Sequence, residues 1–278
     1  MGAAEAAVAA ARDAGAAMGF DLVEPADLDR YNAACAERGT PAMVAPRGNT
    51  RGALVLLLGA SSRLWPAFLD ALAQDGALQR CGDPLDAYTE RCALSIAEVA
   101  HRAAWPSGGG SARVIFAHRP SREVVSSAEE ATDATEGRGG DAGPARYIAI
   151  QRLAEVAGVA ALDADTHLCI HPTFGPWFSL RAAVVLDGVP VPAAVRDRQV
   201  PAVDMPPEDV ARRAAELWAT IGTSYTAARE RWRELVEVRR AAAPGHPWEY
   251  GEDQTRYHYT ADVAFLRTCV ARGRTHAA

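Results

Sequence analysis

The apolar positions of this chain repeat with helical spacing in some segments and form continuous or alternating runs in others. Ala3–Met18 is an alanine-rich segment with strong helix propensity. The run ALVLLL at Ala53–Leu58 contains no polar residue, which predicts a central strand buried on both faces. Asp83 and Pro84 form a helix start, and apolar residues at helical spacing extend that helix to about Ala104.

The second half of the chain is predicted to be mostly helical, apart from one region of strands. A short strand is expected at Arg113–Ala117. The same reasoning predicts four further helices, at Arg146–Gly158, Pro207–Tyr225, Thr226–Ala242 and Glu252–Ala271. We expect an α+β domain with a central, mostly antiparallel sheet flanked by helices.

The segment Thr166–Val189 (THLCIHPTFGPWFSLRAAVVLDGV) predicts a hairpin of two strands. Thr166–His171 alternates, so His167, Cys169 and His171 are expected on one face of the first strand. A loop rich in proline and glycine follows. Trp177–Leu186 is predicted to be the second strand because it is rich in aromatic and β-branched residues.

Arg181 is the only charged residue of that second strand. A buried guanidinium group is costly unless it meets an anion or a cluster of carbonyl groups. We therefore expect Arg181 either to pair with an internal acid or to face a cavity that a carboxylate can enter.

Residues 121–142 differ in composition from the rest of the chain. They are rich in serine, glycine, alanine and acidic residues and show no apolar period. This pattern predicts a mobile surface insertion, and a lid over a pocket is the alternative.

The 278 residues are enough for one large domain or two small ones, and we expect a single domain over 1–278. A net charge of −6 argues against a nucleic-acid-binding protein. Five scattered cysteines without a CxxC pair fit a reducing, cytoplasmic location. No apolar run approaches the ~18 residues of a membrane span, so no membrane association is expected. The chain also contains no GxSxG, P-loop, HExxH or Rossmann motif.

The run CIHPTFGPWFSLR within the predicted hairpin resembles the signature of the methylmalonic aciduria and homocystinuria type C protein family. Gly19-Phe20-Asp21, the DPLD at Asp83–Asp86 and the AEVAG at Ala154–Gly158 are similar to other segments of that family. The resemblance covers most of the chain and is strongest at the hairpin. It implies a nitroreductase-related fold and an enzyme that removes the upper axial ligand of cobalamin. It also implies base-off cobalamin binding, glutathione as the alkyl acceptor, and a reduced flavin, FMN or FAD, as the electron source for decyanation.

The same resemblance implies which residues form the site. Three arginines are expected to hold the carboxylates of glutathione, namely Arg181, Arg233 and Arg267. Nine residues are expected to contact the corrin, namely Thr166, His167, Cys169, Ile170, Phe174, Gly175, Trp177, Leu180 and Trp232. A downstream protein that accepts cobalamin is the further partner implied, and whether the chain forms a homodimer stays open.

His167 departs from the family, which typically has glycine at this position. An imidazole there either crowds the corrin or offers an axial nitrogen to a metal, with Cys169 or His171 as a second ligand. Glu155 is a second departure, because a histidine is expected in its place. These departures leave open a haem or other tetrapyrrole protein, either an enzyme or a carrier, and a flavin-dependent reductase of the same fold.

Overall fold

The computed structural model describes residues 2–45, 53–126, 145–163, 166–222 and 224–276. Its strands are β1 Leu22–Asp27, β2 Ala42–Met43, β3 Leu54–Ala60, β4 Ser111–Phe116, β5 Val124–Val125, β6 Ala161–Asp163, β7 Leu168–Ile170 and β8 Ser179–Asp187. Its helices are α1 Ala3–Ala17, α2 Leu28–Arg38, α3 Leu64–Gln74, α4 Gly76–Gln79, α5 Pro84–Ala104, α7 Ile150–Val156, α8 Ala193–Arg196, α9 Glu208–Ile221, α10 Tyr225–Glu230, α11 Trp232–Ala242, α12 Glu252–Thr260 and α13 Val263–His276.

A four-stranded sheet in the order β1-β3-β8-β4 forms the centre of the molecule, and all its pairings are antiparallel. As predicted, β3 is an inner strand whose residues are all buried. Its side chains alternate between two hydrophobic cores: Leu56 and Leu58 pack in one, and Val55 and Leu57 in the other. The predicted central antiparallel sheet flanked by helices is thus confirmed.

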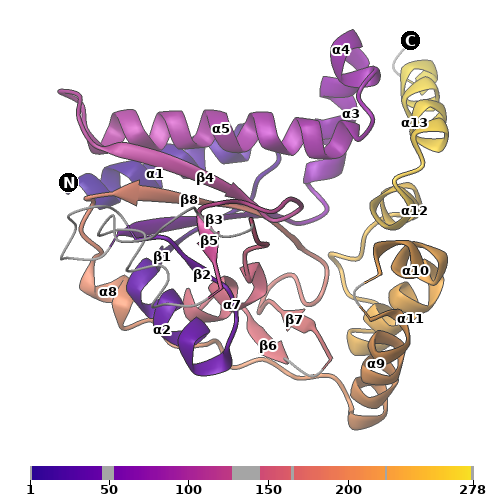
Figure 1. Cartoon of the computed structure of the whole chain (residues 1–278). Coiled ribbons are helices and arrows are strands. Elements are labelled where there is room, and N and C mark those ends of the chain that lie inside the picture. The colour runs from indigo at the N-terminus through magenta and orange to yellow at the C-terminus, as the bar shows by residue number, and fades with distance from the viewer. Residues whose placement is uncertain (1, 46–52, 127–144, 164–165, 223, 277–278) are drawn as a thin grey trace.

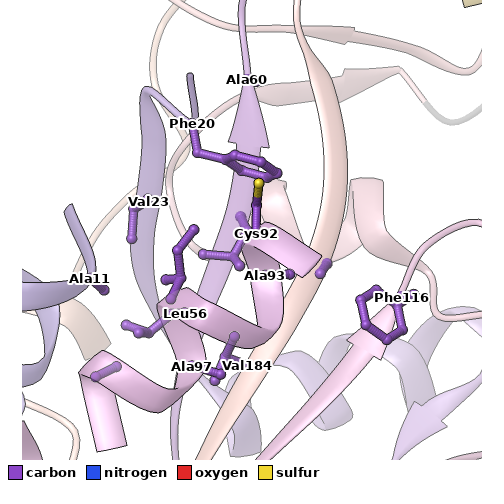
Figure 2. Close-up of a cluster of buried hydrophobic side chains, with 14 of the residues drawn as sticks. Ala11, Phe20, Val23, Leu56, Ala60, Cys92, Ala93, Ala97, Phe116 and Val184 are labelled. Atoms are coloured by element: carbon purple, nitrogen blue, oxygen red, sulfur yellow. The ribbon is translucent and has the colours of Figure 1, made fainter. Parts of the chain in front are cut away.

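Helices cover both faces of this sheet (Figure 1). On one face, α1, α3 and α5 enclose the first core, where Leu56 and Val184 of the sheet lie in one cluster with Cys92 and Ala93 of α5 (Figure 2). On the other face lie α2, α7 and the two small sheets β2–β5 and β6–β7. The helices α9 to α13 form a separate column beside the sheet (Figure 1).

The predicted hairpin over Thr166–Val189 is wrong. β7 pairs with β6 in a separate two-stranded sheet, whereas β8 lies in the central sheet between β3 and β4. β8 is nine residues long and its side chains pack in the cores on both faces of the sheet, so it lies inside the sheet with β3 and β4 paired along its two edges. The first strand also begins later than predicted, because His167 has a left-handed backbone with φ of 57°.

Four of the predicted helices also have different limits, and the predicted Pro207–Tyr225 is α9, which ends at Ile221. α7 begins only at Ile150, because Arg146 forms a bridge with Ser121 instead. The last predicted helix is two helices: Ala261 adopts a left-handed conformation, and Asp262 then accepts a hydrogen bond from the backbone N–H of Phe265 at 2.9 Å. Thr226–Ala242 is likewise divided between α10 and α11.

The first residues of the predicted insertion belong to the fold. Val124 and Val125 form β5, pair with β2 and are buried. Residues 127–142 lie outside the described part of the chain. Among the described helices, none has the length and apolar character needed to cross a bilayer.

Candidate functional site

A cavity of about 390 Å³ lies between the central sheet and the column of C-terminal helices. Residues of β7, β8, α7, α9, α11 and α12 line it, together with the loops before β7 and β8. The lining residues are Ile150, Gln151, His167, Leu168, Cys169, Pro176, Phe178, Ser179, Leu180, Arg181, Trp218, Leu235, Val238, Arg239, His258 and Tyr259. The wall is mainly apolar, with a few polar and charged side chains, which is the usual character of a ligand site.

A β-bulge determines how β8 presents Leu180 and Arg181. Ala182 pairs with Leu58 and Leu180 pairs with Gly59, so Arg181 has no partner residue in β3. Beyond the bulge, Ala182 faces the core beneath α5, and strict alternation would place Leu180 on that same side. Leu180 packs instead against the opposite core, and Arg181 turns toward Asp86 at the beginning of α5.

The guanidinium group of Arg181 is only partly compensated. A terminal nitrogen lies 3.8 Å from Asp86 Oδ1, which is too long for a hydrogen bond. The Arg181 Nε is buried and has no acceptor. Burial, reinforced by the charge of Asp83, raises the pKa of Asp86, although Arg181 and His118 act in the opposite direction. Arg181 therefore retains an N–H group that can bind an anion.

Arg239 of α11 supplies a second cation. Its guanidinium carbon lies 5.6 Å from the ring centre of Trp177, 5.9 Å from Tyr250 and 5.8 Å from Tyr259. This aromatic cage favours the cation electrostatically without neutralising it. Within the described residues Arg239 pairs with no carboxylate, and its Nη1 is buried without an acceptor.

His258 lies in the same wall as the two arginines. Its ring contacts Tyr250 and Tyr259, with centroids 5.7 Å and 5.4 Å away. Burial, together with the charges of Arg181 and Arg239, holds the pKa of His258 well below its usual value. The imidazole is therefore neutral at physiological pH.

The structure brings four of the predicted site residues together at the cavity, namely His167, Cys169, Leu180 and Arg181. The Gln151 side chain donates a hydrogen bond to the His167 carbonyl at 3.0 Å, and the imidazole meets the edge of the Trp218 ring at 5.5 Å. His167 thus occupies a fixed place in the wall.

The other predicted corrin contacts surround the cavity without lining it. Trp177 is fully buried beneath Arg239, and Ile170 packs against α9. The Thr166 hydroxyl accepts the Leu168 backbone N–H at 3.3 Å, which stabilises the turn before β7. Phe174 and Gly175 belong to the turn that His171 closes through two backbone hydrogen bonds with Gly175.

The geometry does not assemble the alternative metal site. The His171 Nδ1 accepts the backbone N–H groups of Thr173 and Phe174 at 3.0 and 3.2 Å. Burial, with a smaller effect of the Glu155 charge, raises the pKa of Cys169 to about 12, so its thiol stays protonated. Glu155 itself pairs with Arg152. The described residues include no group of three or more potential metal ligands.

The remaining predicted residues lie at two other surface depressions. Trp232 and Arg233 line a hollow between α11 and α12, and the Arg233 guanidinium stacks on the Trp232 ring at 4.6 Å. Arg267 lies on α13 at the edge of an apolar groove against α3 and α5. Neither arginine reaches the cavity that Arg181 lines.

Sequence reasoning missed Arg239, His258, Tyr259 and Trp218 as cavity residues. The spacing of Leu235, Val238 and Arg239 was the available signal, because residues three and four positions apart share a helix face. Arg239 thus lies on the inward face of α11, whereas Arg233 lies on its exposed face.

Comparison with known proteins adds evidence of two kinds. No protein-family model matches the chain. Over 126 residues the chain is 31% identical to the mouse protein named cyanocobalamin reductase / alkylcobalamin dealkylase, covering 41% of this chain and 40% of the mouse protein. The fold matches the crystal structure of a B12-trafficking protein CblC from C. elegans, described as a human MMACHC homologue, with a TM-score of 0.62. Together they support the family that the sequence predicts.

The structural match covers 95% of this chain and 96% of the C. elegans chain at 14% identity. It therefore shows that the type C fold extends over nearly the whole chain. The sequence match is more local, since the aligned part spans only 40% of the mouse protein.

Proposed function

We propose that this chain binds cobalamin and removes its upper axial ligand. The observation that carries the proposal is the cavity in which the CIHPTFGPWFSLR segment contributes Arg181 and meets Arg239, both with an unpaired N–H group. That segment carries the resemblance to the type C family, and the names of both similar proteins concern cobalamin. The apolar wall suits the face of a corrin, and the cations suit an anionic co-substrate.

Glutathione is the proposed co-substrate for dealkylation. Arg181 and Arg239 would each donate hydrogen bonds to a carboxylate, with Arg239 in the role first expected of Arg233. Held in this way, the thiolate sulfur attacks the cobalt-bound carbon. A carbon–sulfur bond forms, the cobalt–carbon bond breaks, and its electron pair stays on cobalt. The protein contributes orientation rather than a nucleophile of its own.

Decyanation is the second proposed reaction, and it needs an electron from reduced FMN or FAD. The proposed relationship to nitroreductases is the reason for expecting a flavin. Binding in the base-off form would weaken the bond to the upper ligand in both reactions.

Visible absorbance during titration with cobalamin tests the proposal. Addition of the protein to aquocobalamin and methylcobalamin should produce a base-off spectrum that saturates at micromolar or lower protein concentration. Haemin is titrated in parallel, because His167 places an imidazole in the cavity wall. Unchanged cobalamin spectra together with a shifted haemin spectrum would overturn the proposal in favour of a haem-binding protein.

A further inference from the structure

His258 is a polar side chain of the cavity wall that the proposed function has not yet used. It lies on α12, beside Tyr259, and lines the cavity together with Arg181 of β8 and Arg239 of α11. Within the described part of the chain no hydrogen bond reaches its imidazole nitrogens, and its ring contacts those of Tyr250 and Tyr259. An imidazole without a partner in a ligand cavity is free to exchange a proton with the ligand.

The charged groups that face His258 come from two other elements. Arg181 belongs to β8 and Arg239 to α11, and both lie in the same wall. Behind Arg181, Asp86 of α5 contributes a carboxylate at 3.8 Å from the guanidinium. The neighbours on its own side are two phenols, Tyr250 and Tyr259. With no anion bound, these groups together place a net positive charge around His258.

We propose that His258 is the base that accepts the proton of the thiol bound in this cavity. The inference rests on the proposed function, in which a thiol carboxylate compound occupies the cavity. The sulfur–hydrogen bond breaks, the proton moves to an imidazole nitrogen, and the sulfur keeps the electron pair as a thiolate. After the thiolate has attacked the cobalt-bound carbon, the imidazolium releases the proton to water.

The two arginines make this transfer favourable in two stages. In the free protein burial, together with these two cations, keeps His258 unprotonated and ready to accept a proton. Carboxylates of the bound ligand then offset the charge of both guanidinium groups, which removes one of the two causes that oppose an imidazolium. The thiolate that forms is stabilised by the imidazolium beside it, as thiolates beside protonated histidine are elsewhere.

The test compares His258→Gln and His258→Phe with the unmodified protein. Glutamine keeps a polar group but cannot accept the proton, and phenylalanine keeps the ring contacts with both tyrosines. His101→Phe is the matched control, because His101 also contacts an aromatic ring, that of Trp105, but lies at the far end of α5. Each variant is first checked for an unchanged melting temperature, and His258→Gln serves if His258→Phe does not fold.

Glutathione-dependent loss of methylcobalamin is then measured from pH 6 to pH 10. Both His258 variants should lose about 100-fold or more in kcat at neutral pH, with little change in the KM for glutathione. Their kcat should recover as the pH approaches the ordinary thiol pKa of about 8.5. His101→Phe should keep the profile of the unmodified protein.

Two outcomes would overturn the inference, and they are distinguishable. Active His258 variants with an unchanged pH profile would show that another group accepts the proton, with the proposed function intact. An unmodified protein that never consumes methylcobalamin in the presence of glutathione would overturn the proposed function, and the role of His258 with it.

Discussion

Buried N–H groups without acceptors are the most informative residue-scale feature of this protein. Such a group costs about 1–3 kcal/mol of stability, so folded proteins rarely contain several close together. Arg181 Nε and Arg239 Nη1 are both of this kind and line the same cavity. A bound carboxylate would satisfy them, which is why we assign the anionic co-substrate to this place.

Arg181→Lys and Arg239→Lys test that assignment. Lysine keeps the charge but loses the planar fork of donors. Loss of one charge-assisted hydrogen bond, worth ~1.5–3 kcal/mol, should raise the KM for glutathione roughly tenfold or more. Arg233→Lys is the matched control, since Arg233 is exposed outside the cavity, and its KM should not change. A lower melting temperature of Arg181→Lys, with an unchanged KM for glutathione, would instead show that Arg181 is a structural partner of Asp86.

His167 combines an unusual backbone with a place in the cavity wall. Its φ of 57° lies in the left-handed region, which glycine adopts most readily. The glycine that the type C resemblance implies here therefore suits the backbone as well as the ligand. His167→Gly should leave stability nearly unchanged, because relief of about 1 kcal/mol of backbone strain offsets the lost contact with Trp218. The variant should bind cobalamin more tightly with the same spectrum, whereas a changed spectrum would show that the imidazole is an axial ligand.

At the scale of elements, the bulge in β8 is what connects the sheet to the cavity. Gly59 makes it possible, since a Cβ atom there would lie 2.8 Å from the Ser179 carbonyl oxygen. Gly59→Ala should therefore destabilise the fold by about 1–3 kcal/mol. Displacement of Ser179 should also move Arg181 and raise the KM for glutathione. Gly82→Ala is the control, because a Cβ at Gly82 meets no atom within 4 Å and should change neither property.

Elements with a strong local signal could be predicted from the sequence, and those that depend on distant partners could not. β3 and α5 have the predicted places because an apolar run and an Asp-Pro start are local features. The hairpin prediction failed because pairing of β7 with β6 and of β8 with β3 and β4 is decided by tertiary contacts. No feature of the sequence indicates the bulge. The exchange of sides between Leu180 and Arg181 that it causes was therefore not predicted.

At the scale of the whole molecule, the site depends on α9, α11 and α12 lying beside β7 and the first residues of β8. The family resemblance indicated the cavity residues on or beside β7 and β8, namely His167, Cys169, Leu180 and Arg181. It did not lead to Arg239 or His258, because helix packing determines which positions of the C-terminal helices face inward. Arg267, the third arginine expected at the site, lies instead at a different groove.

The central claim is that this chain transfers the upper ligand of cobalamin to a thiol. The most direct measurement follows methylcobalamin and glutathione with the purified protein, in the dark and without oxygen, and quantifies the methyl thioether of glutathione. We predict one thioether for each methylcobalamin consumed, in a reaction that requires both thiol and protein and slows in Arg181→Lys. Binding of methylcobalamin without any thioether above the protein-free control would contradict the account.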